Sequence, residues 1–266
     1  MSQSTHSSQV TSLLATAKTD GLLSTAAAHV LNVSDLGADI NAAMGVPALN
    51  VTASEVVLVG ILNDDSGSIR FVKGNAQAVR DGNNLVLDAL QVSKQGDGIQ
   101  IMNMYLNGTL LYPFSPLSGA VRMDSGNFDP NGGTPLFKRS LVLLGTMAAK
   151  TQEYNDAGVP VRSVSLIVTD GNNESHDRAT AADVAKVVES LLKSENHIIA
   201  AMGIDDGTTD FRAVFKEMGI PNEWILTPGN TPSEIRKAFA VFSKSAVRAS
   251  QSAASFSKTA AGGFAV

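Results

Sequence analysis

Short apolar runs alternate with longer amphipathic segments from Glu55 onward, and this alternation limits the possible folds more than any other feature of the chain. The apolar runs are Val56–Asn63, Val161–Thr169 and His197–Gly203, with a shorter one at residues 223–227. Segments with helical spacing occupy residues 69–90, 135–155, 179–194, 209–217 and 231–249. This pattern predicts an α/β fold with a doubly wound, mostly parallel, Rossmann-like sheet that helices cover on both faces.

One turn adds an antiparallel strand to this sheet. Asn107 and Gly108 separate two further apolar runs, residues 98–106 and 109–114. An Asn-Gly pair between such runs is a strong signal for a β-hairpin, because both residues accept the positive φ angles of a tight turn. We therefore expect one antiparallel strand at an edge of the sheet.

The two ends of the chain differ in composition from the alternating part. Residues 1–9 are rich in Ser, Thr and Gln, and residues 10–46 carry Ala- and Leu-rich helical segments. The last residues are rich in Ser, Ala and Gly. The expected organisation is an N-terminal extension at residues 1–50, flexible and then helical, one domain at residues 51–249, and a flexible tail at residues 250–266.

Composition removes several classes of function. The chain has 266 residues, a formal net charge of −5 and no run of Lys or Arg, which argues against a nucleic-acid partner. It has no Cys, which excludes disulfides, thiolate metal sites and thiol catalysis. No apolar stretch is long enough to cross a membrane, and residues 1–6 do not resemble the start of a signal peptide. We therefore expect a cytoplasmic protein with no membrane partner.

Oxygen-bearing side chains gather in three loops, each at the predicted carboxyl end of a strand or just before a helix. These side chains are Asp64, Ser66 and Ser68 in the first loop, Thr134 in the second and Asp170 in the third. In a doubly wound sheet the three loops lie on one rim, which is where such folds bind ligands. Three hydroxyls and two carboxylates suit a hard cation such as Mg²⁺.

Each loop also has an ordinary structural explanation. Asp and Ser are common N-cap residues, so the first loop fits the start of a helix near residue 69. Thr134 followed by Pro135 is a normal helix start, and Asp170 followed by Gly171 is a normal turn. Capping and metal ligation are compatible at Thr134. The combination of all three loops favours the metal site over three unrelated caps and turns.

The three loops together resemble a known motif. Asp64-x-Ser66-x-Ser68, then Thr134, then Asp170 followed by glycine look like the metal-ion-dependent adhesion site (MIDAS) of von Willebrand factor A (VWA) domains. All five positions of the motif are present and in order. The resemblance covers residues 55–249 and implies the VWA fold for that part of the chain.

The resemblance also implies a role for each residue. Ser66, Ser68 and Thr134 would be direct ligands of Mg²⁺, with Mn²⁺ or Ca²⁺ as alternatives. Asp64 would orient water and accept hydrogen bonds from the serines, and Asp170 would be a direct or water-mediated ligand. A Glu or Asp of a protein partner would fill the sixth position. Intracellular members of the family often act beside AAA+ ATPases of the MoxR type, which makes such an ATPase, or a stress or conflict complex, a candidate partner.

The predicted function is therefore a non-enzymatic protein-binding module. A metal-dependent hydrolase or phosphoryl-transfer enzyme on a similar fold is the alternative, with Asp65 and Asp170 as the only evident acids for a nucleophile or general base. In the motif, the position of Asp65 usually points away from the metal, so we expect it to be solvated or to contact a neighbouring loop. A surface adhesin is a third interpretation.

Overall fold

The computed structural model describes residues 3–32, 34–51, 53–93, 98–173 and 178–264. Its strands are β1 (Val56–Asn63), β2 (Ile99–Tyr105), β3 (Leu110–Pro116), β4 (Val161–Thr169), β5 (His197–Gly203) and β6 (Ile225–Leu226). Its α-helices are α1 (Gln3–Thr19), α2 (Thr25–Leu31), α3 (Ser34–Ala43), α4 (Asn75–Gln91), α5 (Leu136–Asp156), α6 (Ala181–Lys193), α7 (Phe211–Glu217), α8 (Pro232–Ser250) and α9 (Ala253–Gly262). Within the described ranges, no helix is both long enough and apolar enough to cross a membrane.

The six strands of the described residues form one sheet in the order β3-β2-β1-β4-β5-β6. Neighbouring strands are parallel except for β3, which pairs antiparallel with β2 at the edge. Every residue of β1, β2, β4 and β5 is buried, as expected from their nearly continuous apolar runs. The predicted α/β class, the mostly parallel sheet and the antiparallel edge strand are confirmed.

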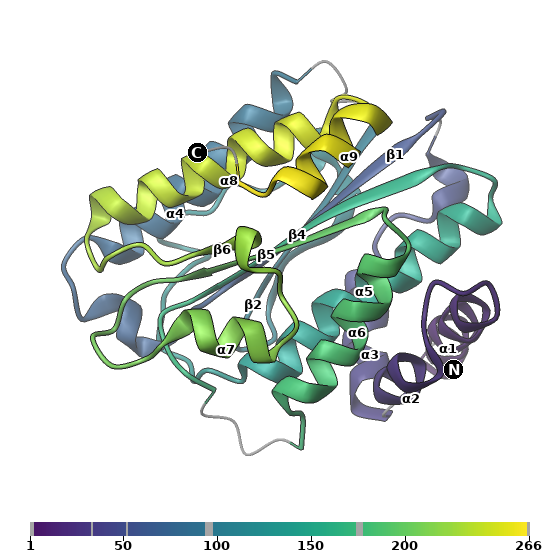
Figure 1. The fold of residues 1–266 in the computed structure, drawn as a ribbon, viewed down its shortest axis with the longest axis horizontal. Coiled ribbons are helices and arrows are strands. Elements are labelled where there is room, and N and C mark those ends of the chain that lie inside the picture. The colour runs from purple at the N-terminus through teal and green to yellow at the C-terminus, as the bar shows by residue number, and fades with distance from the viewer. Residues whose placement is uncertain (1–2, 33, 52, 94–97, 174–177, 265–266) are drawn as a thin grey trace.

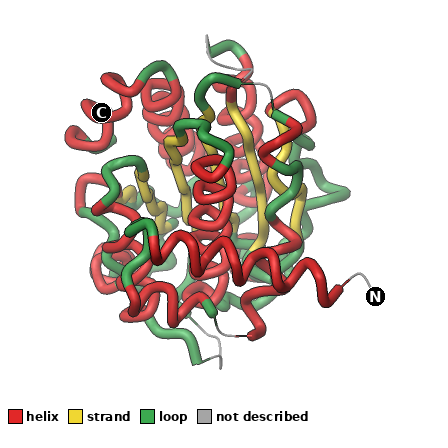
Figure 2. Tube along the Cα trace, turned by 90° about the vertical axis from the view of Figure 1, so that its right-hand side faces the viewer, coloured by secondary structure: helices red, strands yellow, loops and turns green. Residues whose placement is uncertain are grey.

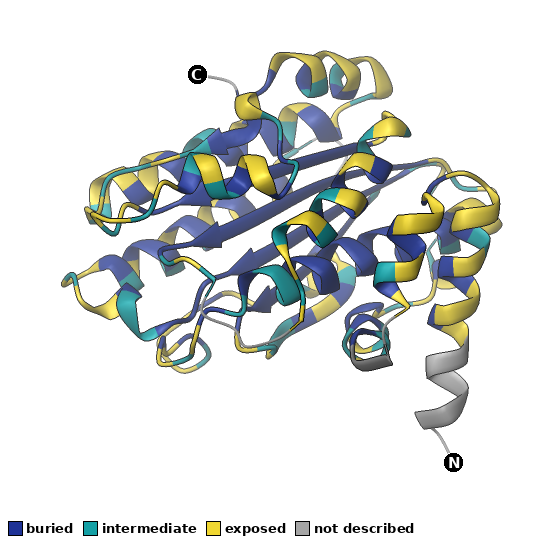
Figure 3. Ribbon diagram, turned by 60° about the horizontal axis from the view of Figure 1, so that its bottom comes forward, coloured by how far each residue is buried: buried dark blue, intermediate teal, exposed yellow. Residues whose placement is uncertain are grey.

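Helices cover both faces of the sheet and add a further layer on one of them (Figure 1). α4 and α8 pack against each other on one face, and α9 packs on α8. α5 and α6 lie on the other face, with α1, α2 and α3 outside them. Figure 2 shows the strands enclosed by helices, and Figure 3 shows that the sheet is buried while the outer sides of the helices are exposed. The core therefore lies on both faces of the sheet.

The N-terminal helices pack closely on α5. A Cβ built on Gly145 of α5 would lie 2.7 Å from Ile40 Cδ1 and 3.0 Å from Leu31 Cδ2, so the side chains of α2 and α3 lie directly on the surface of α5 at this glycine. An ion pair joins Asp39 of α3 to Arg139 of α5. These contacts make α1, α2 and α3 an outer layer of the same packed molecule.

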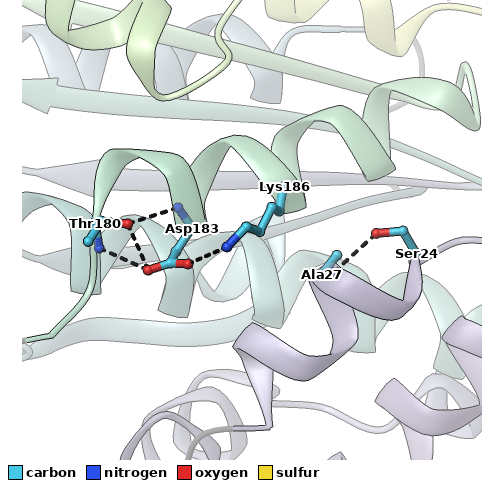
Figure 4. Close-up of polar contacts among 5 residues, drawn as sticks. All are labelled: Ser24, Ala27, Thr180, Asp183 and Lys186. Atoms are coloured by element: carbon cyan, nitrogen blue, oxygen red, sulfur yellow. Dashed lines mark hydrogen bonds and ion pairs between the residues drawn. The ribbon is translucent and has the colours of Figure 1, made fainter.

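Helix α2 is also held against α6 (Figure 4). Ser24 Oγ accepts a hydrogen bond from the Ala27 N–H at 3.1 Å and so caps α2. The Ser24 N–H donates to Ser190 Oγ of α6 at 2.6 Å. In the part that the structure describes, the expected N-terminal extension contains α1, which begins at Gln3, followed by α2 and α3.

Two helix starts show the capping chemistry that their sequences suggest. At α6, Thr180 Oγ1 accepts from the Asp183 N–H, the Asp183 carboxylate accepts from the Thr180 N–H, and Lys186 pairs with Asp183 at 2.8 Å (Figure 4). At α8, Thr231 Oγ1 accepts from the Glu234 N–H at 3.3 Å. Thr231 is therefore the N-cap of α8.

The end of the chain differs from the expected flexible tail. Residues 253–262 form α9, which Ser252 caps by accepting a hydrogen bond from the Ser255 N–H at 3.1 Å. Phe256 and Phe264 are buried, and the Phe264 ring lies 4.9 Å from the ring of Trp224. Two buried aromatic side chains fix a segment whose small residues alone would favour disorder.

The buried imidazole at the start of β5 predicts a pH-dependent stability. His197 is 3% exposed, and burial lowers its pKa to about 4, whereas an unfolded His titrates near 6.5. The unfolded chain therefore takes up the proton first, so the free energy of unfolding falls as the pH falls from about 6.5 to 4, by about 2 kcal/mol at pH 5.

Urea unfolding at pH 7 and pH 5 tests this expectation, with His197→Gln as the control. The variant lacks the imidazole, so it should lose about 2 kcal/mol less than the unaltered protein between the two pH values. Equal losses in both proteins would contradict the prediction.

Candidate metal centre

Two loops of the candidate site leave neighbouring strands at the same edge of the sheet. β1 and β4 pair in parallel, with Leu62 opposite Ile167. The residues after β1 and those after β4 therefore come together at the carboxyl ends of the strands. This arrangement brings Asp64 and Asp170 close to each other although they are far apart in the sequence.

The third loop is hydrogen-bonded to the first. The Asp65 carbonyl accepts the N–H groups of Asn131, at 2.8 Å, and Gly132, at 2.9 Å. The Gly67 N–H donates to the Gly132 carbonyl at 3.2 Å. These backbone bonds bring Thr134, two residues after Gly132, to the rim that the other two loops form.

Oxygens from two of the loops form a compact triangle. Ser68 Oγ donates to Asp170 Oδ1 at 2.7 Å, Ser66 Oγ donates to the same oxygen at 3.1 Å, and the two hydroxyl oxygens are 2.8 Å apart. In an octahedral Mg²⁺ shell with oxygens at about 2.0–2.1 Å, neighbouring ligand oxygens are about 2.9 Å apart. The triangle therefore has the dimensions of one face of such a shell.

The Asp64 carboxylate joins the first and third loops. It is fully buried and accepts three hydrogen bonds: from the Ser66 N–H at 2.7 Å, Thr169 Oγ1 at 2.7 Å and the Asp170 N–H at 3.1 Å. The family resemblance implies bonds from the serine hydroxyls instead. In the structure the Ser66 and Ser68 hydroxyls point to Asp170, and Asp64 binds backbone and Thr169 donors.

Thr134 lies against the turn that contains Asp170. A Cβ built on Gly171 would be 3.4 Å from Thr134 Oγ1, and the Thr134 side chain is buried. Helix α5 begins at Leu136, and its N-cap is Pro135. Thr134 is therefore not the N-cap residue of α5, which removes the ordinary explanation for its position.

The serines of the first loop are not helix caps either. Ser66 precedes the 3₁₀ helix η2 (Gly67–Arg70) but makes no capping bond with its side chain. The next α-helix, α4, begins at Asn75 and not near residue 69 as we expected. Gly74 has a φ of 97°, which lies outside the right-handed helical range, so α4 cannot extend through it toward residue 69.

Asp65, the extra acid within the motif, faces the β2–β3 hairpin. Its Oδ1 accepts the Asn107 N–H at 2.9 Å, and the side chain is buried. Burial raises the pKa of Asp65 to about 6. The expectation that Asp65 contacts a neighbouring loop is confirmed.

The charges at the site favour a bound cation. Burial and the nearby Asp64 carboxylate raise the pKa of Asp170 to about 7, although the bonds from Ser66 and Ser68 oppose this shift. The carboxylates of Asp64 and Asp170 are both buried and near each other, so they repel each other when both are ionised. A positive charge beside Asp170 would remove that cost.

The donor set fits a hard divalent cation. Among the described residues no three His, Asp or Glu side chains converge on one point, so a site rich in carboxylate or imidazole is absent there. The five candidates supply hydroxyl and carboxylate oxygens only, which suit Mg²⁺, Mn²⁺ or Ca²⁺ better than softer metals. The residues present therefore fit the ion that the motif implies.

Sequence reasoning missed the residues that support the site. Thr169, the last residue of β4, bonds Asp64. Behind the first loop, Asn63 Nδ2 donates to Asn103 Oδ1 at 3.0 Å and to Asn83 Oδ1 at 3.3 Å, and Asn103 Nδ2 donates to Asn83 Oδ1 at 2.6 Å. All three amides are fully buried. An Asn inside an apolar strand could have indicated such a network from the sequence, because a buried side-chain amide needs hydrogen-bond partners.

No protein-family model and no curated protein matches this sequence. Among solved structures, the chain is similar to the pilus adhesin SpaC from Lactobacillus rhamnosus GG, with 13% identity and a TM-score of 0.54 over 74% of this chain and 31% of that one. At this identity the likeness shows the fold alone.

Two further solved structures are similar at lower TM-scores. A von Willebrand factor type A protein from Catenulispora acidiphila is 18% identical, with a TM-score of 0.48 over 74% of this chain and 44% of that one. Proximal thread matrix protein 1 from the mussel byssus, with a zinc-occupied MIDAS motif, is 18% identical, with a TM-score of 0.46 over 73% of this chain and 46% of that one. The chain spans less than half the length of each of these three structures. The fold of this chain is therefore an α/β fold with a six-stranded, mostly parallel sheet, similar to part of the SpaC pilus adhesin.

Proposed function

We propose that this chain is a protein-binding module that holds one divalent cation at the rim of its sheet and uses it to capture a carboxylate of a protein partner. The observation that carries the proposal is the oxygen triangle of Ser66, Ser68 and Asp170. Its edges fit one face of an octahedral shell, and its members come from loops that the fold itself brings together. A VWA-like fold supports the same conclusion, since domains of this type are typically protein-binding modules.

Each residue of the proposed site has a distinct part. Ser66, Ser68 and Thr134 offer hydroxyl oxygens, and Asp170 offers the one carboxylate that touches the serine hydroxyls. Asp64 fixes the loops through its three hydrogen bonds. A bound Mg²⁺, Mn²⁺ or Ca²⁺ would supply a position that attracts an Asp or Glu of the partner. Because Asp170 is the only carboxylate among the three oxygens of the triangle, a bound divalent cation would keep part of its positive charge to attract a further carboxylate.

The hydrolase or phosphoryl-transfer alternative has less support. Asp65 is hydrogen-bonded to Asn107 in the hairpin. Asp170 is the other candidate acid, and its Oδ1 already accepts two hydroxyl hydrogen bonds. A non-enzymatic role, an AAA+ ATPase of the MoxR type as partner and a cytoplasmic location all stay predictions.

A metal-dependent pull-down tests the proposed function. The immobilised protein, incubated with extract of its source cell in Mg²⁺, should retain a partner that EDTA releases. Asp64→Asn should abolish retention, because its amide cannot accept all the hydrogen bonds that the carboxylate accepts. Asp65→Asn, with the same change of charge one residue away, should retain the partner.

Two results would count against the proposal. Retention that survives EDTA, or that Asp64→Asn leaves unchanged, would mean that the metal centre is not the binding site. Hydrolysis of a generic phosphoester in Mg²⁺, lost in Asp64→Asn and kept in Asp65→Asn, would favour the enzyme alternative. Replacing the partner's acidic residue by its amide should also abolish retention.

A further inference from the structure

Three buried side-chain amides join the start of the first loop to helix α4. Asn63 is the last residue of β1 and is followed directly by Asp64. Asn103 belongs to β2, and Asn83 belongs to α4. All three residues are fully buried. Their hydrogen bonds therefore connect two strands and one helix in the interior, at the base of the candidate metal centre.

The side-chain oxygen of Asn83 is the shared acceptor of this network. It accepts from Asn63 Nδ2 at 3.3 Å and from Asn103 Nδ2 at 2.6 Å. Asn63 Nδ2 also donates to Asn103 Oδ1 at 3.0 Å, so each side chain contacts the other two. Replacing Asn83 alone would remove two of the three hydrogen bonds.

The network ties together the two ends of the first loop. This loop, residues 64–74, connects β1 to α4 and carries the serines of the oxygen triangle. Asn63 lies immediately before the loop, and Asn83 lies in the helix that follows it. A shift of α4 relative to β1 would move Ser66 and Ser68 relative to the third loop. The amide hydrogen bonds oppose such a shift.

Helix α4 has other contacts that keep it on the sheet. Apolar side chains along it are buried, among them Val79, Val86, Leu87 and Leu90. Buried amides add less to stability than apolar side chains do, and some polar atoms of this network have no hydrogen-bond partner among the described residues. Hydrogen bonds are directional, however, whereas apolar contacts are not. The amides are therefore better suited to fix the position of α4 than to hold it in place.

We propose that Asn63, Asn83 and Asn103 are positioning residues of the candidate metal centre. Their hydrogen bonds hold the first loop so that the Ser66 and Ser68 hydroxyls keep the spacing that a divalent cation needs. This inference rests on the proposed function, because it requires a cation at this site. It gives the three amides a part in metal affinity that the apolar side chains of α4 do not have.

Magnesium affinity and stability, measured side by side, test the proposal. Asn83→Ala removes the shared acceptor and should lower the affinity for Mg²⁺ by about 10-fold in calorimetric titration. Leu87→Ala is the matched control, because Leu87 lies one turn further along α4 and is also buried. The control should lower the midpoint of thermal unfolding at least as much and change the affinity for Mg²⁺ by less than about 2-fold. Both titrations are made well below the midpoints of unfolding.

A second variant keeps the test decisive if Asn83→Ala does not fold. Asn103→Ala breaks the network from β2 and should lower the affinity for Mg²⁺ by a similar factor. An unchanged affinity in the folded Asn variants, or an equal loss in Leu87→Ala, would overturn the proposal. If the unaltered protein binds Mg²⁺ but retains no partner, the proposed function fails, and the comparison of variants still decides the role of the amides. A protein that binds no Mg²⁺ would overturn both.

Discussion

Asp64→Asn is expected to lower the affinity of the protein for Mg²⁺ by about 100-fold, whereas Asp65→Asn should leave it nearly unchanged. The two residues are adjacent, both are buried, and both substitutions remove one negative charge. Only their contacts differ. Asp64 bonds the two metal loops, and Asp65 bonds Asn107 of the hairpin.

The reason for the large effect is the geometry of the Asp64 carboxylate. Its Oδ1 accepts from the Ser66 N–H and its Oδ2 accepts from Thr169 Oγ1 and the Asp170 N–H. An Asn has one acceptor oxygen, so one of these backbone N–H groups would face an NH₂ group and lose its partner. The first and third loops would then move relative to each other, and the triangle of ligand oxygens would open.

Calorimetric titration of the metal-free protein with Mg²⁺ and Mn²⁺ measures the two affinities. Thermal unfolding without metal serves as the control for folding, since both variants should remain folded. Equal losses of affinity in Asp64→Asn and Asp65→Asn would point to a general charge effect. The role that we assign to Asp64 would then be wrong.

Much of the fold was predictable because local and tertiary signals agree. The apolar run Val56–Asn63 is buried at every position in β1, and the Asn107-Gly108 turn joins β2 to the antiparallel strand β3. Thr231, Pro232 and Glu234 mark the start of α8 as the sequence suggests. At these places composition, periodicity and turn chemistry all favour one structure.

The closeness of Asp64 and Asp170 was predictable from the sequence, but the hydrogen bonds of the candidate site were not. Loops that end parallel strands share a rim, and this rule alone predicts that Asp64 and Asp170 lie near each other. The rule does not say from which groups the Asp64 carboxylate accepts hydrogen bonds. One of these groups is the Thr169 hydroxyl, and in the sequence Thr169 is only the last residue of an apolar strand. Such bonds depend on side-chain directions that only the packed structure defines.

The ends of the chain were harder to predict because their local signals are weak. The tail is rich in Ser, Ala and Gly, yet α9 forms because Phe256 and Phe264 find partners far away in the sequence. In α4, helical periodicity starts near residue 69, but the helix begins at Asn75 because Gly74 adopts a positive φ. Periodicity measures which side chains are apolar and does not register the backbone angle of one glycine.

Phe239→Ala is expected to lower the free energy of unfolding by about 3–5 kcal/mol. Phe239 of α8 is fully buried, and a Cβ built on Gly82 of α4 would lie 2.2 Å from its Cδ2. The aromatic ring therefore rests directly on the α4 backbone and joins the two helices that cover one face of the sheet. Removing it leaves a cavity that rigid helices on a sheet cannot fill.

Phe71→Ala is the matched control for this substitution. Phe71 is 85% exposed, so the same deletion should change stability by less than about 0.5 kcal/mol in urea unfolding. A similar loss in both variants would show that the effect does not come from the α4–α8 contact.

A double-mutant cycle makes the expectation for α4 and α8 specific. Gly82→Ala alone forces the new methyl group against the Phe239 ring and should cost about 1–3 kcal/mol. In the Phe239→Ala background the same methyl group enters the space that the ring has left, so its cost should vanish or become a gain. The double variant should then be more stable than the sum of the single losses by about 1 kcal/mol or more. Additive losses would mean that α4 and α8 do not meet at these two residues, since the close approach at Gly82 is the only source of the expected coupling.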